Sequence, residues 1–93
     1  MTNKEKKEFT ENISHNIKVI RDYLGHTQGS FSDLLGIKRS SIGAYEEGRA
    51  FPPINVLMKI SDLCDYHIED ICHHKLEKVL RMSNRSFEKT LEL

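Results

Sequence analysis

Apolar side chains recur every three or four residues along most of the chain, the spacing that places them on one face of an α-helix. The first series consists of Phe9, Ile13, Ile17, Ile20 and Leu24. It predicts an amphipathic helix over residues 10–24, which Gly25 is expected to end. Residues 1–8 are polar, and we expect residues 1–9 to form a flexible arm. A basic arm that reaches DNA is the alternative interpretation of the same residues.

Between residues 27 and 48 the pattern predicts two short helices joined by a tight turn. In the first helix, Phe31, Leu34 and Leu35 fall at i, i+3 and i+4 and are expected to face the core. Thr27 can cap the start of this helix, because its hydroxyl can accept a hydrogen bond from a backbone N–H group. Gly36 can end it, because glycine enters the left-handed conformation without a Cβ clash.

The second of these helices is predicted to start at Lys38 or Arg39 and to stop at Gly48. Ile42 and Tyr45 are expected to point into the core. A helix, a glycine turn and a second helix make up the helix-turn-helix pattern, whose second helix can lie in the major groove of DNA.

The next stripe of apolar residues predicts a buried helix that ends near Asp65. Its members are Ile54, Leu57, Ile60, Leu63 and Cys64. Phe51 precedes it in a proline-containing loop, and we expect its ring to lie over the core as a lid. Pro53 suits the first turn of the helix, where a backbone N–H group would be unsatisfied in any case.

The end of the chain predicts a short helix from about His67 that continues to about Met82, and a further helical turn or two beyond it. The apolar residues of this region are Ile68, Ile71, Leu76, Val79, Leu80, Phe87 and Leu91. An apolar stripe of this size on a small protein is expected to be buried against another surface, and we expect a second subunit to provide that surface. Packing on the chain's own first helix is the alternative.

The ordered set of residues from 27 to 52 resembles the Cro/phage-repressor type of helix-turn-helix domain, also called the XRE family. The resemblance is carried by Thr27, Gln28, Leu35, Gly36, Ile37, Arg39, Ser40, Ser41, Ile42, Tyr45, Glu46, Glu47, Gly48, Arg49 and Pro52. It implies an all-α, five-helix lambda-repressor-like domain over residues 10–72 and an additional helical tail over residues 73–93. It also implies a homodimeric transcriptional regulator, with repression favoured, that binds a two-fold operator in double-stranded DNA and has no enzymatic activity.

The resemblance assigns roles to single residues of the helix-turn-helix. Those expected to touch DNA are Gln28, Lys38, Arg39, Ser40, Ser41, Ala44 and Arg49. Arg39, Ser40 and Ala44 would face the major groove, and the others would contact phosphates. The guanidinium fork of Arg39 matches guanine O6 and N7, while a phosphate contact is its alternative role. Arg21 and Glu46 would form a structural ion pair, with two solvated charges as the alternative.

Two features of the sequence depart from the family's usual pattern. Gly29 lies inside a predicted helix, where glycine costs about 1 kcal/mol relative to alanine. Ser32 replaces the usual alanine, and its hydroxyl can bond back to a carbonyl.

The net charge of the chain argues mildly against DNA binding, but the distribution of its charged residues remains compatible with it. The formal net charge is +0, although nucleic-acid binders usually carry a basic excess. Lys38, Arg39 and Arg49 cluster around the second helix of the motif, so we expect a basic face and weak non-specific binding. The charged N-terminal residues do not resemble a signal peptide, and the expected location is the cytoplasm.

The sequence offers little other chemistry. The possible zinc ligands are Cys64, His67, Cys72, His73 and His74, but their spacing fits no compact zinc site. We therefore expect no metal and no cofactor, and no nucleophile–base arrangement suggests catalysis. The alternative to a DNA-binding regulator is an antitoxin-like or protein-interaction module whose tail binds a partner protein.

Overall fold

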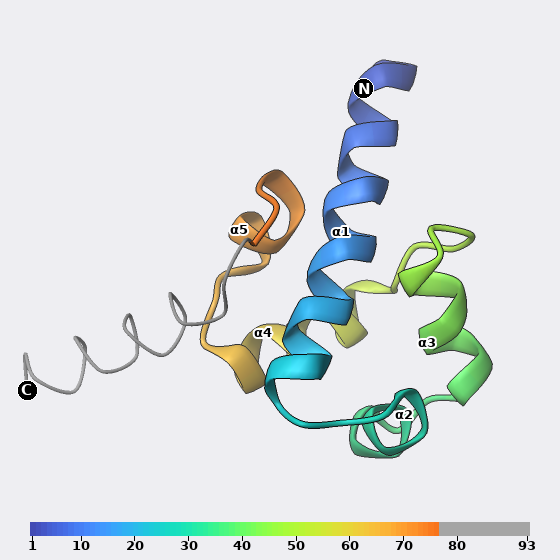
Figure 1. Ribbon diagram of the computed structural model, residues 1–93. Coiled ribbons are helices and arrows are strands. Elements are labelled where there is room, and N and C mark those ends of the chain that lie inside the picture. Colours follow the sequence, from blue (N-terminus) through green and yellow to red (C-terminus); the bar gives the residue numbers. More distant parts are fainter. Residues whose placement is uncertain (77–93) are drawn as a thin grey trace, which may run out of the picture.

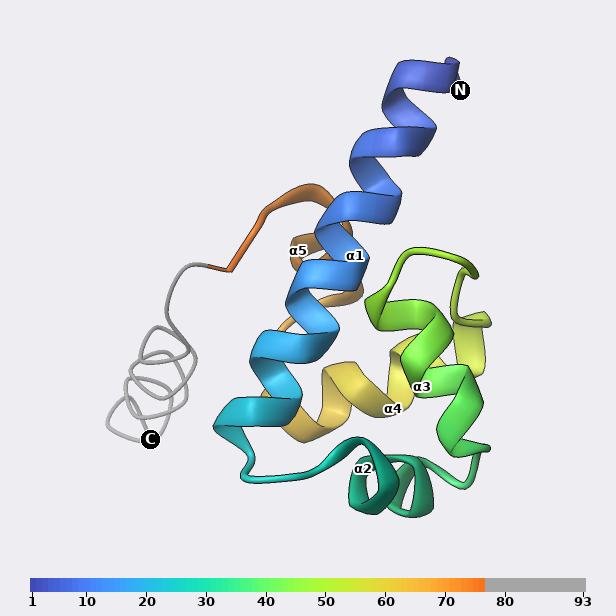
Figure 2. The same ribbon diagram turned by 45° about the vertical axis from the view of Figure 1, so that its right-hand side comes forward.

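The computed structural model describes residues 1–76, in which the chain forms α-helices and no strand (Figure 1). The helices are α1 (Asn3–Tyr23), α2 (Gln28–Leu35), α3 (Arg39–Glu46), α4 (Ile54–Cys64) and α5 (Ile68–His73). This arrangement confirms the predicted all-α, five-helix class for the described part of the chain. Helix α1 runs through the middle, with α5 on one side of it and α3 on the other in both views (Figures 1 and 2).

Helix α1 begins at Asn3, seven residues before the predicted start at Thr10. The cause is a capping box at its N-terminus. The backbone N–H group of Glu5 donates to the Thr2 hydroxyl at 3.1 Å, and the Glu5 carboxylate accepts from the Thr2 backbone at 3.3 Å. These bonds satisfy two donors that a helix start otherwise leaves without partners. Residues 3–9 are therefore helical, which corrects the boundary predicted at Thr10.

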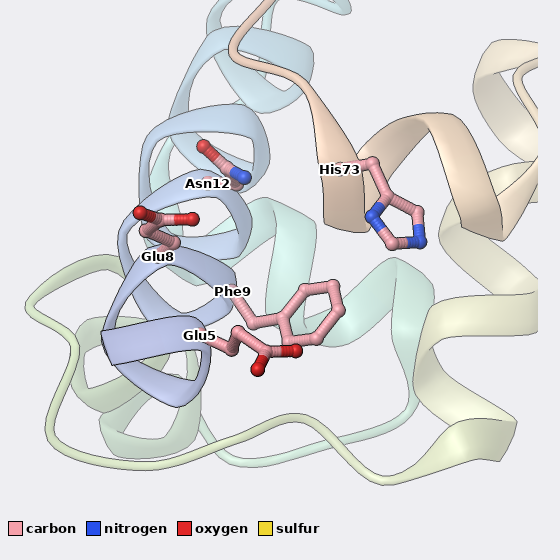
Figure 3. Close-up of a pocket in the computed structure, with 5 residues that line it drawn as sticks. All are labelled: Glu5, Glu8, Phe9, Asn12 and His73. Atoms are coloured by element: carbon pink, nitrogen blue, oxygen red, sulfur yellow. The ribbon is translucent and has the colours of Figure 1, made fainter. Parts of the chain in front are cut away.

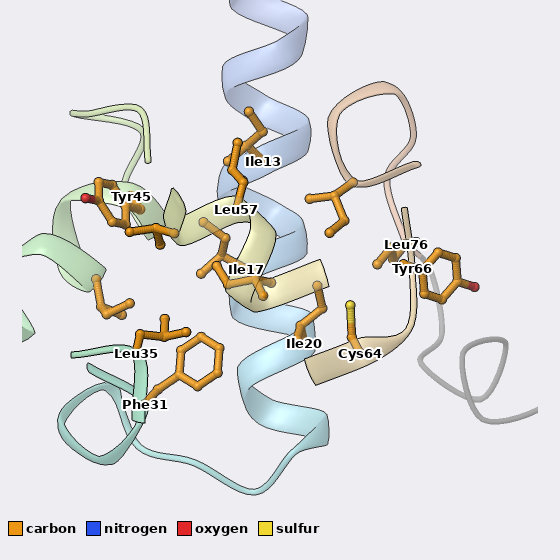
Figure 4. Packing of buried hydrophobic residues seen from close by; sticks show 14 residues of the cluster. Ile13, Ile17, Ile20, Phe31, Leu35, Tyr45, Leu57, Cys64, Tyr66 and Leu76 are labelled. Atoms are coloured by element: carbon orange, nitrogen blue, oxygen red, sulfur yellow. The ribbon is translucent and has the colours of Figure 1, made fainter. Parts of the chain in front are cut away.

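One contiguous core holds the helices together, and side chains of α1, α2, α3 and α4 meet in it (Figure 4). Its completely buried apolar members are Ile17, Ile20, Phe31, Ile42, Ile60 and Ile71. The predicted inward residues Leu35 and Tyr45 are also buried. The periodicity therefore predicted the centre of the core correctly.

Three residues that the stripes placed inward are instead exposed, namely Leu34, Ile54 and Leu63. On α4 the inner face consists of Val56, Leu57, Ile60 and Cys64, the spacing of one helical face. Ile54 and Leu63 lie on either flank of that face, because each residue turns the helix by about 100°. Helical spacing alone does not determine which apolar residues of a helix have a neighbouring element to pack against.

Phe51 does not cover the core, because its side chain is 46% exposed. The neighbouring Pro52 is buried in its place. In an extended segment successive side chains point to opposite sides, so an inward Pro52 turns Phe51 outward. Pro53 is the N-cap residue of α4, one position before the predicted one.

Helix α5 ends at His73, and the backbone is extended at His74, so the helix does not continue through residues 74–76 toward Met82 as predicted. The expectations for residues 77–93, including the dimerisation segment, lie outside the described residues. Leu76 packs into the chain's own core, with 8% of it exposed, which for this residue favours the alternative to cover by a second subunit. Within residues 1–76 no helix combines the length and apolar character needed to cross a bilayer.

Polar side chains of α1 hold the end of α5 in place. Asn16 is fully buried, and its amide donates to the carbonyl groups of Ile71 at 2.7 Å and His74 at 2.6 Å. Its carbonyl oxygen accepts from the Leu76 backbone N–H at 2.7 Å. Asn12 donates to the Cys72 carbonyl at 2.9 Å. These bonds satisfy backbone groups that the end of a helix leaves without intrahelical partners.

Candidate nucleic-acid interface

The start of α2 and the turn to α3 have the local geometry that the sequence predicted. The Thr27 hydroxyl accepts from the Ser30 N–H at 3.0 Å, and the Ser30 hydroxyl accepts from the Thr27 N–H at the same distance. Gly36 ends α2 in the left-handed conformation, with φ of 71°. Ser32 is buried, and its hydroxyl donates to the Gly29 carbonyl at 2.7 Å. The small Ser32 therefore satisfies its own polar group at the crossing of the two helices.

Helix α3 has one buried and one open face. Ile42 and Tyr45 are buried in the core. The open face follows from the turn of about 100° per residue and consists of Arg39, Ser40, Gly43 and Ala44. Arg39 and Ser40 are exposed, and a Cβ atom added at Gly43 would meet nothing within 4 Å. The predicted base-reading residues thus share a face on which Arg39 and Ser40 are exposed and Ala44 is half-buried, as is Ser41 beside it.

The Arg21–Glu46 ion pair is present and joins α1 to α3. The Arg21 Nε and Nη2 atoms donate to the two Glu46 carboxylate oxygens at 2.6 Å and 3.0 Å. Only 11% of the Arg21 side chain and 5% of the Glu46 side chain are exposed. The hydrogen bonds to Glu46 raise the pKa of the Arg21 guanidinium above its ordinary value, although burial opposes them. Arg21 therefore remains charged at any working pH and fixes the end of α3 against α1.

Gln28 extends this network to α2. Its Nε2 atom donates to the Glu46 Oε1 atom at 3.1 Å. One carboxylate on α3 is therefore bound by side chains of both α1 and α2. The sequence did not indicate this contact, because the resemblance assigned Gln28 to a DNA phosphate. The second hydrogen of the same amide is compatible with that predicted role.

The remaining predicted cations lie at the two ends of α3. Lys38 is the exposed N-cap residue of α3, and its side chain makes no capping bond. Arg49 follows the helix, and its Nε atom lies 2.6 Å from a Glu47 carboxylate oxygen. Both side chains of this pair are more than 60% exposed, at 64% and 61%. An exposed pair contributes at most about 1 kcal/mol, so Arg49 can exchange Glu47 for another anion at little cost.

The cysteines and histidines form no candidate metal centre among the described residues, where no group of three potential ligands comes together. Cys64 is buried and Cys72 is half-buried, and neither forms a disulfide. Burial raises the pKa of both thiols above the ordinary value, which disfavours the thiolate that binds metals and attacks disulfides.

The fold and the exposed face of α3 define a helix-turn-helix DNA-binding domain. The sequence profile of the helix-turn-helix family matches residues 17–71, which is more than half of the chain, and the chain belongs to this family. The matched region is therefore a DNA-binding module of the kind found in transcriptional regulators.

A characterised protein with a similar sequence is the cryptic phage CTXphi transcriptional repressor RstR of Vibrio cholerae serotype O1. The two sequences are 33% identical over 52 residues, a segment that covers 56% of this chain and 46% of RstR. The chain thus matches less than half the length of this relative. No solved structure gives a significant match.

Two structural features escaped sequence reasoning although signals for them exist. The Thr-x-x-Glu pattern at residues 2–5 is a capping-box signature and predicts the early start of α1. Asn16 interrupts the apolar face formed by Ile13, Ile17 and Ile20. A polar residue at such an inward position needs a buried partner, which here is the end of α5.

Proposed function

We propose that this domain represses transcription by binding, as a homodimer, to a two-fold operator in double-stranded DNA. The observation that supports this most directly is the open face of α3, which is rich in small and polar groups. The Arg21–Glu46–Gln28 network immobilises the helix behind that face. Such preorganisation favours recognition, because little conformational freedom is lost on binding.

The face of α3 suits the major groove. Arg39 would donate two hydrogen bonds to guanine O6 and N7, the commonest specific contact between proteins and DNA. Ser40 would bond a base edge or phosphate, and Ala44 would meet a thymine methyl group. Gly43, which has no side chain, lets the backbone of α3 approach the groove closely.

Phosphate contacts would come from residues around the same face. The candidates are Gln28, Lys38, Ser41 and Arg49. Lys38 and Arg49 flank α3, so their charges would fall on the strands that border the groove. Because the net charge is +0, we expect little non-specific affinity. Binding should still weaken as salt rises, because Lys38 and Arg49 would release counterions from the phosphates that they neutralise. A repressor of this kind acts by occluding RNA polymerase, and the similar RstR is itself named a transcriptional repressor.

The test is selection of bound duplexes from a random pool, followed by titration at low and moderate salt. Arg39→Ala is expected to relax one base position by about 1–3 kcal/mol. Lys18→Ala, an exposed cation on α1, is the matched control and should leave sequence preference unchanged. A uniform loss of affinity across all DNA sequences would indicate that Arg39 contacts a phosphate group and not a base. Absence of binding even at low salt would refute the DNA-binding proposal, because phosphate contacts are strongest there.

An antitoxin-like or protein-interaction module is the second candidate, and the net charge of +0 favours it. In that case the tail over residues 73–93 would bind a partner protein, and DNA binding would be secondary. The same titration identifies a protein-interaction module that has lost its DNA affinity, since such a module would not retain duplex DNA at low salt. An antitoxin-like protein would instead be identified by a tail that orders only when a partner protein is bound.

A further inference from the structure

Three large apolar side chains are exposed together where the chain passes from α3 into α4. Phe51, Ile54 and Met58 are 46%, 64% and 54% exposed. Ile54 and Met58 are four residues apart on α4 and are therefore neighbours on its surface. Phe51 precedes Ile54 by three residues, a stretch that spans at most about 10 Å. We call these residues the α4 apolar patch.

Nothing in the folding of the described chain accounts for this patch. The inner face of α4 is already supplied by Val56, Leu57, Ile60 and Cys64. Clustered apolar side chains on a soluble domain commonly mark a site of association. Folding alone would tolerate polar residues at these positions equally well.

We propose that a second copy of this chain covers the α4 apolar patch in a two-fold symmetric contact. The inference rests on the proposed function, because a two-fold operator requires a two-fold dimer. It names the surface that the dimer uses and places it outside the tail.

Charge favours a self-contact at this surface. In a two-fold contact each patch meets its own copy, so charges near the axis would face like charges. The stretch over residues 50–58 contains no charged residue. By contrast, the pocket between α1 and α5 is lined by Glu5 and Glu8 as well as Phe9, Asn12 and His73 (Figure 3). A two-fold contact there would bring carboxylates together.

The position of the patch also suits the operator. Recognition helices of a dimer lie about 34 Å apart, so each lies about 17 Å from the two-fold axis. Phe51 follows the last residue of α3, Glu46, by five residues, which span at most about 17 Å. The length of this segment is therefore compatible with a two-fold axis at the patch and α3 at the required distance from it. The loop between α3 and α4 also lies on the opposite side of α1 from α5 (Figures 1 and 2).

The test is the oligomeric state of full-length variants by sedimentation equilibrium, with helicity checked by circular dichroism. Ile54→Glu combined with Met58→Glu should weaken the dimer by about 100-fold or more, because two central apolar contacts become charged. Leu63→Glu is the matched control, since Leu63 is 39% exposed on the other flank of α4. It should dimerise like the wild type. If the double variant loses helicity, the same measurement is made on the single variant Ile54→Gln.

Other outcomes overturn the inference. Dissociation by Leu91→Glu, with no effect of the patch substitutions, would assign the dimer to the tail. A wild-type chain that is monomeric both free and on a selected duplex would exclude self-association. The DNA-binding proposal can fail independently of this inference. In that case the wild type would dimerise through the patch but bind no duplex at low salt. The patch variant should still bind random duplexes at low salt, because its α3 is unchanged.

Discussion

Replacing Arg21 by methionine tests whether the ion pair with Glu46 contributes to the free energy of unfolding because it is buried. Methionine keeps an apolar stem of similar length, so the change removes mainly the charge and its hydrogen bonds. Glu46, only 5% exposed, would lose partners at 2.6 Å and 3.0 Å and keep the Gln28 amide at 3.1 Å. The variant therefore leaves a buried carboxylate with one neutral donor.

The expected cost follows from that leftover charge. Breaking a buried pair by removing one partner costs about 3–5 kcal/mol, and the remaining Gln28 bond favours the lower end, about 3 kcal/mol. A domain of this size has a free energy of unfolding of about 5–14 kcal/mol, so the loss is a large fraction. With a urea m-value of about 1 kcal/mol/M, the unfolding midpoint should fall by about 3 M.

A matched control is available in the same chain. The Arg49–Glu47 pair has the same Nε–Oε2 distance, 2.6 Å, but its side chains are 64% and 61% exposed. Arg49→Met should therefore change the free energy of unfolding by less than about 1 kcal/mol. Combining Arg21→Met with Glu46→Gln removes both buried charges and should recover most of the lost stability. If Arg21→Met cost no more than Arg49→Met in urea titrations, burial would not be the source of the effect.

The remaining predictions concern the α5 anchor and two glycines. Asn16→Ala should cost about 3 kcal/mol or more, because several buried backbone groups lose their partner, each worth about 1–3 kcal/mol. Hydrogen exchange at the Leu76 amide should accelerate specifically, and an unchanged rate would contradict the anchor. Gly29→Ala should raise stability by about 0.5–1 kcal/mol, because its Cβ would lie at ordinary contact distances, 3.8 Å from the Thr27 hydroxyl and 3.9 Å from the Arg39 Cδ atom. Gly43→Ala should bring a similar gain in thermal stability yet weaken DNA binding; unchanged DNA binding would contradict the placement of Gly43 against the groove.

Much of the helix-turn-helix was predictable because its signals are local. The cap at Thr27 and the left-handed turn at Gly36 depend on bonds within a few residues, so the sequence alone determines where α2 begins and ends. The alternation of buried and open positions on α3 follows likewise from helical geometry. The Arg21–Glu46 pair was predictable only through the resemblance to a family, since the two residues lie 25 positions apart.

Tertiary structure decided which apolar faces are covered and where polar groups find partners. Ile54 and Val56 are both apolar residues of α4, but only Val56 faces a neighbouring helix and becomes buried. Gln28 bonds to Glu46, and Asn16 bonds to the end of α5, through contacts between residues distant in sequence. Sequence periodicity therefore determined the helices and their apolar faces. Burial required the fold, because it depends on what packs against a face as well as on the residues that form it.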